Sequence, residues 1–198
     1  MSTTLMVIIG LVVLLGLWGI SIFNRLVQLK NQVKNAWSQI DVQLQRRYDL
    51  IPNLIETVKG YMTYEKGTLE AVINARNLAQ AARSKVEASG GPTEGSLKEL
   101  AVAETSLKGA MTNIFALAEN YPELKASENM KQLQEELSST ENKVAFSRQA
   151  YNDNAMLYNT YQQQFPATFF ASLFGHHPVD LFQLSDQEAR NAPKVSFT

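Results

Sequence analysis

The chain has 198 residues, and its 18 Lys and Arg side chains against 19 Asp and Glu leave a formal net charge of -1, which argues against a nucleic-acid-binding module. It contains no Cys and two adjacent His residues, His176 and His177, so disulfides and thiolate metal sites are excluded and we predict neither a metal nor another cofactor. Few Gly (10) and Pro (6) residues favour a helical protein, and we expect the two His side chains in a solvent-exposed turn.

The first 24 residues carry no charged side chain. Residues 5–23 form a 19-residue apolar run, which as a helix spans about 28 Å, close to the hydrocarbon thickness of a bilayer. Leu5 begins this run, and Trp18 and Phe23 suit the aromatic belt at a membrane interface. We therefore predict a transmembrane anchor over residues 1–24.

A cleaved signal peptide and a buried core helix are the two other interpretations of this segment. A signal peptide carries a basic leading region and a small-residue cleavage site. This chain starts Met-Ser-Thr-Thr and runs through Ser21, Ile22 and Phe23. A retained anchor is the favoured interpretation.

The charges beyond the run predict its orientation. Residues 25–47 hold one acidic side chain, Asp41, and five basic ones: Arg25, Lys30, Lys34, Arg46 and Arg47. Because Lys and Arg resist translocation, we expect a single-pass membrane protein with the bulk of the chain in the cytoplasm. The reversed orientation would make it a membrane protein with an exported domain.

Beyond the anchor, apolar and aromatic residues recur at steps of three and four, the spacing of a coiled-coil seam. Arg47 takes the one missing slot, and this pattern predicts one helix from the membrane to about Gly60. The seam residues are Val33, Trp37, Ile40, Leu44, Ile51, Leu54, Val58 and Tyr61.

Three further amphipathic helices follow in the sequence. The second covers about residues 69–86 and stops at a Gly-rich linker over 89–95, and the third begins with a capping box of Ser96 and Glu99 and ends at Tyr121-Pro122. The fourth runs from about Ser127 to Phe165. The predicted fold is all-α: the transmembrane helix continues into an antiparallel, up-down-up-down four-helix bundle over residues 25–165, with two long outer and two shorter inner helices.

An aromatic-rich segment follows the fourth helix. Because the first helix rises from the membrane and each short link reverses direction, the fourth should return the chain to the bilayer. The aromatic side chains then either lie in the lipid interface or cover the exposed stalk of the first helix, and both alternatives stay open. They belong to Phe165, the last residue of the predicted bundle, and to Phe169, Phe170 and Phe174, which lie in a C-terminal juxtamembrane segment and extended tail over residues 166–198.

Charged side chains at seam positions form a candidate buried polar cluster. Arg47, Arg76 and Glu104 lie on the seams of the first three helices, and Asp41 and Glu65 lie within a turn of the pattern. Because a buried unpaired charge is costly, we expect Arg47 to pair with Glu104 or Glu65. Such a pair fixes the helix register, which is the favoured interpretation, or forms a proton-handling or ligand-binding centre.

Pro52 lies inside the first predicted helix. It removes the amide that would bond the Tyr48 carbonyl, so we expect a kink there. Asn53 or a water molecule is a candidate donor to the freed carbonyl.

The fourth helix has a polar seam of Tyr and Asn side chains. These side chains could form hydrogen bonds across a groove between subunits or inside one bundle. They are Asn142, Asn152, Asn154, Asn159, Tyr151, Tyr158 and Tyr161.

The sequence lacks the motifs of several enzyme classes. It has no Gly-rich phosphate loop, no Glu-x-x-His pair, no nucleophile elbow and no dinucleotide fingerprint. We predict no catalytic residue and no enzyme.

With these residues laid out, the chain resembles the LemA family of bacterial membrane proteins over nearly its full length. The resemblance rests on residues 36–44, 46–54 and 58–61, on the Tyr151-Asn152 and Tyr158-Asn159 pairs, and on the closing residues 193–197. It implies an N-terminal anchor in the bacterial inner (cytoplasmic) membrane and a cytoplasmic helical bundle, and it supplies no established reaction. One LemA-like relative is associated with building organelle membranes, which implies a role in membrane organisation.

The leading functional hypothesis is a non-enzymatic, membrane-anchored scaffold. Its partners would be the membrane together with further copies of itself or another membrane protein. The alternative is a stress or ligand sensor that transmits a change through the kinked first helix.

Overall fold

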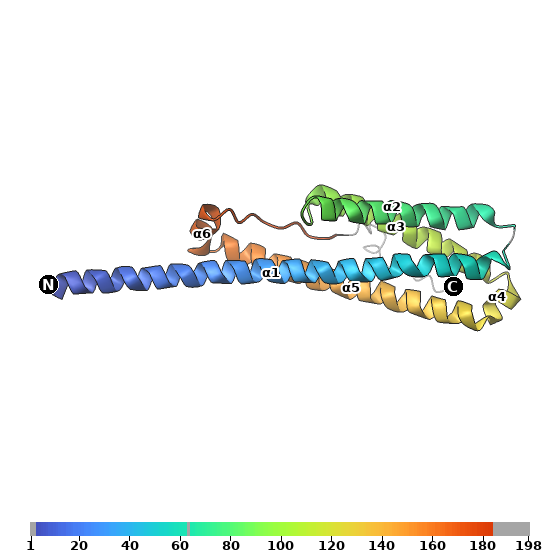
Figure 1. The fold of residues 1–198 in the computed structure, drawn as a ribbon, viewed down its shortest axis with the longest axis horizontal. Coiled ribbons are helices and arrows are strands. Elements are labelled where there is room, and N and C mark those ends of the chain that lie inside the picture. The colour runs from blue at the N-terminus through green and yellow to red at the C-terminus, as the bar shows by residue number, and fades with distance from the viewer. Residues whose placement is uncertain (1–2, 63, 184–198) are drawn as a thin grey trace, which may run out of the picture. The chain divides into compact units, whose positions relative to one another are not determined.

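A computed structural model of the protein describes residues 3–62 and 64–183, and every regular element in these residues is a helix (Figure 1). The predicted all-α class is therefore confirmed for this part of the chain. The helices are α1 (Thr3–Lys59), α2 (Lys66–Ala88), α3 (Glu94–Ala118), α4 (Pro122–Ala126), α5 (Glu128–Gln163) and α6 (Ala167–Leu173).

The chain divides into two compact units, and the two longest helices run through both. Unit 1 consists of Met1–Gln43 and Lys143–Leu181, and unit 2 consists of Leu44–Asn142 and Phe182–Thr198. Unit 1 thus holds the first part of α1, the end of α5 and all of α6. Unit 2 holds the rest of α1, then α2, α3, α4 and the start of α5.

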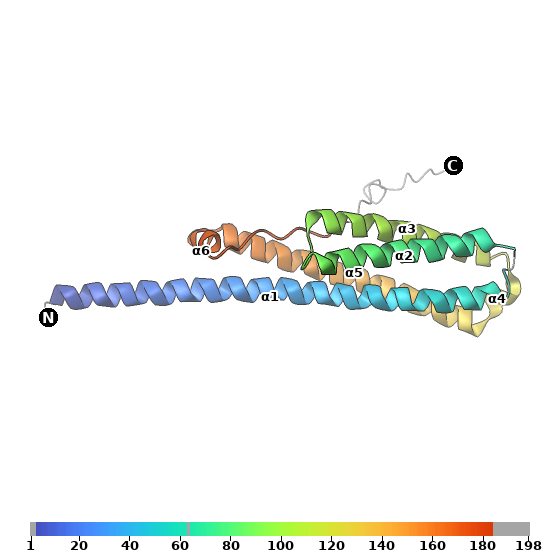
Figure 2. The same ribbon diagram turned by 45° about the horizontal axis from the view of Figure 1, so that its top comes forward.

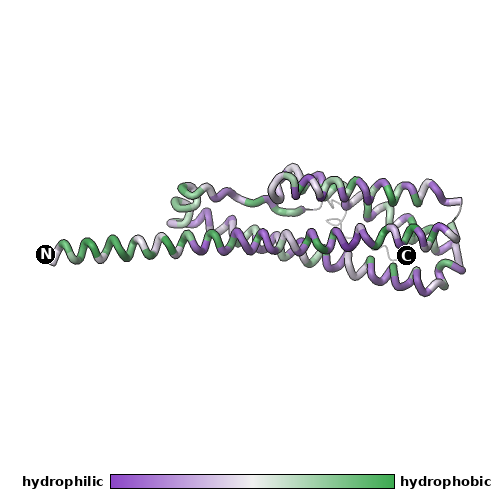
Figure 3. Tube along the Cα trace, viewed as in Figure 1, coloured by the Kyte–Doolittle hydropathy of each residue, from purple (hydrophilic) through white to green (hydrophobic). Residues whose placement is uncertain are grey.

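The beginning of α1 is an apolar rod. Every residue from Thr3 to Trp18 is exposed, and Figure 3 shows that this stretch is hydrophobic while the later turns alternate with hydrophilic residues. Among the described residues, α1 is the one helix that is long and apolar enough to cross a membrane. An apolar surface of this size in water is unfavourable, so lipid is the solvent that suits it.

In unit 1, α1 and α5 lie side by side (Figures 1 and 2). The Trp37 and Tyr151 rings meet edge to face at a centroid distance of 5.8 Å. The Tyr151 and Tyr158 side chains of α5 are fully buried. Large aromatic rings therefore supply much of the core of this unit.

In unit 2, α2 and α3 run side by side (Figures 1 and 2). The core consists of apolar side chains from every helix of the unit, at the spacing expected of amphipathic helices. Its members include Ile51, Leu54 and Val58 from α1, Val72, Ala79 and Val86 from α2, Leu100, Leu107 and Ile114 from α3, Leu124 from α4 and Leu137 from α5.

The seam predicted for the first helix agrees with the burial in the structure. All of its apolar members from Val33 to Val58 are buried, and so is Arg47 in the missing slot. Tyr61 is 43% exposed because α1 ends at Lys59, before the seam would reach it.

The start of α3 differs from the prediction. The helix begins at Glu94, and its capping box is formed by Thr93 and Ser96 instead of Ser96 and Glu99. Thr93 is extended and takes the N-cap position, and the Ser96 hydroxyl accepts a hydrogen bond from the Thr93 amide at 3.0 Å. Glu99 is left free to form an ion pair with Lys85 of α2.

Two short helices were absent from the prediction. α4 begins at Pro122, which suits the first turn because proline lacks only an amide that would stay unbonded there. α6 follows α5 after Pro166. Residues 184–198, the end of the predicted tail, lie outside the described residues.

Candidate functional site

The most deeply buried charges of the described residues form one ion pair in unit 2. The Arg47 guanidinium on α1 lies 2.8 Å from the Glu104 carboxylate on α3, and the two residues are only 5% and 6% exposed. Glu104 is one of the two carboxylates that the sequence suggested for Arg47. This buried ion pair therefore joins α1 to α3.

Tyr48 is the second partner of the same carboxylate. Its hydroxyl donates a hydrogen bond to the other oxygen of Glu104, and its side chain is fully buried. Arg47 and Tyr48 are consecutive on α1, so both carboxylate oxygens are held by neighbouring residues of one helix. Sequence reasoning missed Tyr48, although it lies four residues after Leu44 and three before Ile51, the spacing of a seam position.

Burial dominates the electrostatics of this cluster. It raises the pKa of Glu104 above its usual range, while the Arg47 charge and the Tyr48 hydrogen bond oppose the rise. Burial, followed by the nearby Glu104 carboxylate, raises the pKa of Tyr48. The phenol therefore remains a hydrogen-bond donor at physiological pH.

Arg76 of α2 joins the cluster through the backbone of α1. Its Nε donates to the Tyr48 carbonyl at 2.8 Å, and this is the carbonyl that Pro52 leaves without its usual amide partner. α1 continues through Pro52 to Lys59. The donor is an arginine from a neighbouring helix, which corrects the expectation of Asn53 or a water molecule.

The other two members of the predicted cluster lie elsewhere. Glu65 precedes α2 and accepts a 3.4 Å hydrogen bond from the Tyr121 hydroxyl. Asp41 is a half-buried residue of α1 in unit 1. The structure thus brings together Arg47, Arg76 and Glu104, with Tyr48 added.

A small pocket of about 180 Å³ opens beside Arg47 in unit 2. Lys108 of α3 and Glu141 of α5 lie at its edge and form a 2.9 Å ion pair. The remaining lining side chains include Met111, Phe115 and Leu137. The charges at this pocket are already paired within the chain, an arrangement that suits a structural role better than catalysis.

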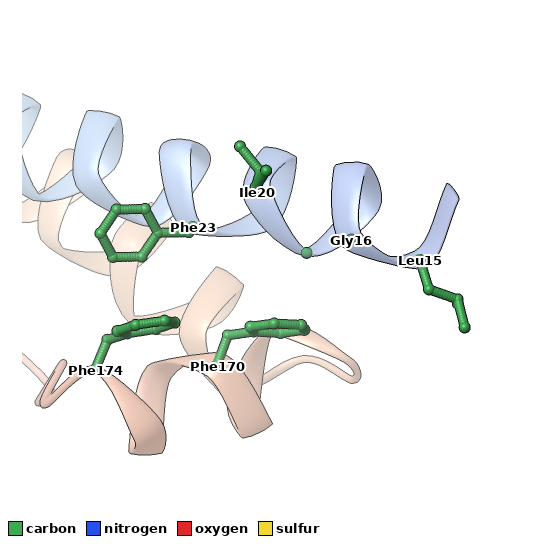
Figure 4. A pocket seen from close by; sticks show the side chains of 7 residues that line it. Leu15, Gly16, Ile20, Phe23, Phe170 and Phe174 are labelled. Atoms are coloured by element: carbon green, nitrogen blue, oxygen red, sulfur yellow. The ribbon is translucent and has the colours of Figure 1, made fainter. Parts of the chain in front are cut away.

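The predicted aromatic segment forms a contact with the anchor in unit 1. The Phe23 and Phe174 rings lie 4.7 Å apart between centroids, and Phe170 lies against Gly19 (Figure 4). A side-chain carbon added at Gly19 would lie 3.1 Å from the Phe170 ring. The glycine therefore permits the close approach of α6 to α1.

The other aromatic side chains of this segment do not cover the anchor. Phe165 is 87% exposed and Phe169 is 65% exposed. Leu173 at the end of α6 is as exposed as Phe169. Part of the segment thus packs on α1 and part of it presents an exposed apolar surface.

Polar residues of α5 hold the chain that follows α6. Gly175 turns the backbone with φ +67°, and the Asn159 amide then bonds both the amide and the carbonyl of Val179 at 2.8 Å each. The Tyr151 hydroxyl donates to the Asp180 carbonyl at 2.8 Å. The polar seam of the fourth predicted helix is therefore satisfied within one chain at these positions.

His176 is not in the exposed turn expected from the sequence. It is half-buried, and its Nδ1 lies 2.9 Å from the Tyr158 hydroxyl. Burial, with smaller contributions from Lys30 and His177, lowers the pKa of His176. His177 is exposed. Among residues 3–62 and 64–183, no three His, Asp or Glu side chains converge as metal ligands.

Comparisons with known proteins find relatives over most of the chain. The model of the LemA family matches residues 36–197. Protein LemA of Metamycoplasma hominis is 27% identical over 165 residues, which cover 83% of this chain and 70% of that protein. Magnetosome protein MamQ of Magnetospirillum gryphiswaldense is 22% identical over 194 residues, or 88% of this chain and 68% of MamQ. Magnetosome protein MamQ 2 of Paramagnetospirillum magneticum is 23% identical with the same coverage.

Proposed function

The chain belongs to the LemA family, and from this premise we propose that it is a non-enzymatic, single-pass scaffold of the bacterial cytoplasmic membrane. Residues 1–24 form the anchor, residues 25–165 form an antiparallel four-helix bundle, and residues 166–198 form a juxtamembrane segment and tail. The bundle associates with other copies or with another membrane protein. Both MamQ relatives described above are magnetosome proteins by name, which supports a role in organising membranes.

The exposed apolar start of α1 is the observation that carries this proposal. It is uncharged up to Asn24, exposed from Thr3 to Trp18, and continuous with the helix that supplies the core of both units. One continuous helix would therefore connect the membrane span to the bundle, as a membrane-anchored scaffold requires.

The aromatic segment supports a second contact with the membrane. Phe165, just before α6, and Phe169, within α6, are both exposed. α6 packs on the anchor at Gly19. Aromatic and apolar side chains at this position favour the boundary between headgroups and acyl chains. α6 would then lie in the membrane interface and hold the stalk of α1 at a fixed height.

The polar cluster supports a structural role for the bundle. Glu104 is occupied by Arg47 and Tyr48, and Arg76 is occupied by the Tyr48 carbonyl. Each of these bonds joins two helices, so the cluster fixes their register. A sensor that bent at Pro52 would first have to break the bond from Arg76.

In-cell crosslinking tests the scaffold proposal. The full chain carries no Cys, so single Cys residues introduced at exposed positions such as Val102 and Phe146 of unit 2 report only designed crosslinks. After treatment of the cells with a membrane-permeant bismaleimide, we expect thioether-linked dimers or a defined adduct with a membrane protein, and Leu78→Cys serves as a further exposed position. A strictly monomeric chain with no adduct at any of these positions would refute the proposal.

A reporter fusion tests the orientation. The five basic residues that follow the span favour a cytoplasmic bundle. A C-terminal fluorescent protein should therefore be bright and a C-terminal alkaline phosphatase inactive. The reverse pattern would favour the exported-domain alternative.

A further inference from the structure

An apolar groove lies between α1 and α6 in unit 1. It has a volume of about 300 Å³, at the lower end of the range for small-molecule sites. Leu15, Gly16, Ile20 and Phe23 line it from α1, and Phe170 of α6 and Phe174 directly after α6 line it from the other side (Figure 4). All of these lining groups are apolar.

Two glycines of α1 shape this groove in different ways. At Gly19, the missing side chain lets the Phe170 ring approach closely, which places α6 against α1. At Gly16, a side-chain carbon would meet no atom within 4 Å. One glycine therefore brings the two walls together, and the other leaves open space between them.

Both walls belong to uncharged stretches of the chain. No Lys, Arg, Asp or Glu occurs in residues 1–24, and none occurs between Asp153 and Asp180. Leu15 and Gly16, which line the groove, belong to the exposed apolar stretch of α1 from Thr3 to Trp18. Its surroundings are therefore those of a lipid-facing surface, which favours a lipid over a water-soluble ligand.

Basic side chains follow the groove along α1. Arg25 and Lys30 are exposed on the turns after Phe23, where a helix that leaves a bilayer meets the phosphate groups. A phospholipid whose acyl chain lay in the groove could place its phosphate at this level.

We propose that the groove between α1 and α6 binds one acyl chain of a membrane phospholipid, with the headgroup phosphate at the level of Arg25 and Lys30. The proposal rests on the membrane anchoring of α1, and it is independent of the partner of the bundle. The bound chain fills the space over Gly16 and joins α6 to the anchor. The packing of α6 on α1 would then depend on whether this lipid is bound.

Native mass spectrometry of the full-length protein tests this site. The protein is purified from membranes in mild detergent and titrated with palmitoyl-oleoyl phosphatidylglycerol. We expect one lipid to remain bound to the unaltered chain after detergent removal. In Gly16→Leu, the leucine side chain occupies the groove, and we expect lipid retention to fall at least tenfold.

Gly10→Leu is the matched control because Gly10 lies on the same span, outside the groove, with no atom within 4 Å of an added side chain. Lipid retention in this variant should equal that of the unaltered chain. Glycerol phosphate, which has the headgroup chemistry without the chains, should not displace the lipid. Equal retention in Gly16→Leu, or no retained lipid in the unaltered chain, would overturn the proposal.

A cysteine at Phe174 distinguishes lipid from a second copy. If two copies met at this groove, Phe174→Cys would give a disulfide-linked dimer in membranes, and the lipid proposal would fail. If the Cys variants of unit 2 gave no crosslink while the unaltered chain still retained the lipid, only the proposed scaffold function would be refuted. Membrane pelleting of every variant confirms that the anchor is intact.

Discussion

At the scale of single residues, Glu104 is the buried carboxylate of the part of the chain that the structure describes. It is held by Arg47 and by Tyr48, and all three side chains are almost completely removed from water. Removing one charge leaves the other without a partner in a site of low polarity. The two residues should therefore be strongly coupled.

We expect Arg47→Met to destabilise the protein by about 3 kcal/mol, because the Glu104 charge is then buried without its cation. Arg47→Met with Glu104→Gln should recover most of this loss, since no charge remains and the Gln oxygen can accept the bond from Tyr48. Chemical denaturation of detergent-solubilised protein measures both free energies of unfolding. Additive losses in the double variant would contradict the coupling.

The raised pKa of Glu104 gives a pH dependence of defined sign. The folded chain holds this proton more tightly than the unfolded chain, whose Glu side chain titrates at about 4.3. This group therefore adds stability as the pH falls from neutrality through its folded pKa towards about 4.3.

Glu104→Gln removes this titration. The stability of the unaltered chain relative to Glu104→Gln should thus increase as the pH is lowered from neutrality towards the ordinary pKa of a Glu side chain, as measured by thermal unfolding of the two proteins side by side. A gap that narrows as the pH falls would show that Arg47 outweighs burial and holds the pKa of Glu104 low.

At the scale of elements, the path of α1 through Pro52 depends on α2. Proline removes the amide that would bond the Tyr48 carbonyl, and Arg76 donates to this carbonyl instead. A hydrogen-bonded partner from another helix thus compensates for a local defect in the first. The effect of a substitution at Arg76 on the free energy of unfolding should therefore depend on whether residue 52 is proline.

Arg76→Met should cost about 1 kcal/mol, the net value of a typical hydrogen bond. In a Pro52→Ala background the restored amide can bond the Tyr48 carbonyl, so the cost of Arg76→Met should fall. Arg83→Met is the control. Arg83 donates to the Gln45 side chain at 2.6 Å, so Arg83→Met should lower the free energy of unfolding by the same amount in both backgrounds. Equal costs for Arg76→Met in both backgrounds would refute the link.

α5 shows how much of an element's role depends on its neighbours. Its periodic Tyr and Asn residues are evident in the sequence, but two kinds of partner were equally consistent with them. The structure shows that Tyr151, Tyr158 and Asn159 bond the segment after α6. That segment has no regular hydrogen-bonding pattern of its own, so no local signal could have identified it as the partner.

At the scale of the whole molecule, the apolar start of α1 determines where the protein resides. A surface that is apolar on every side from Thr3 to Trp18 is stable in lipid and aggregates in water. The retained-anchor interpretation makes a direct prediction about the mature protein.

We expect mass spectrometry of the membrane fraction to find a chain that retains residues 1–24. Alkaline carbonate washing should leave it in the pellet, because a spanning helix is held by burial in hydrocarbon and not by surface charge.

Leu14→Lys places a charge near the centre of the span and should reduce membrane insertion. A mature chain that lacks its first two dozen residues would contradict the anchor.

The sequence by itself determined the helical class, the apolar first helix, the buried seam of α1 and the family, because each depends on local periodicity or on residue patterns along the chain. The choice of Glu104 as the partner of Arg47, the rescue of the Tyr48 carbonyl by Arg76 and the packing of Phe170 on Gly19 were decided by the tertiary structure. Each of these contacts joins residues that are distant in the chain, and periodicity shows which face of a helix is buried without showing what lies against it.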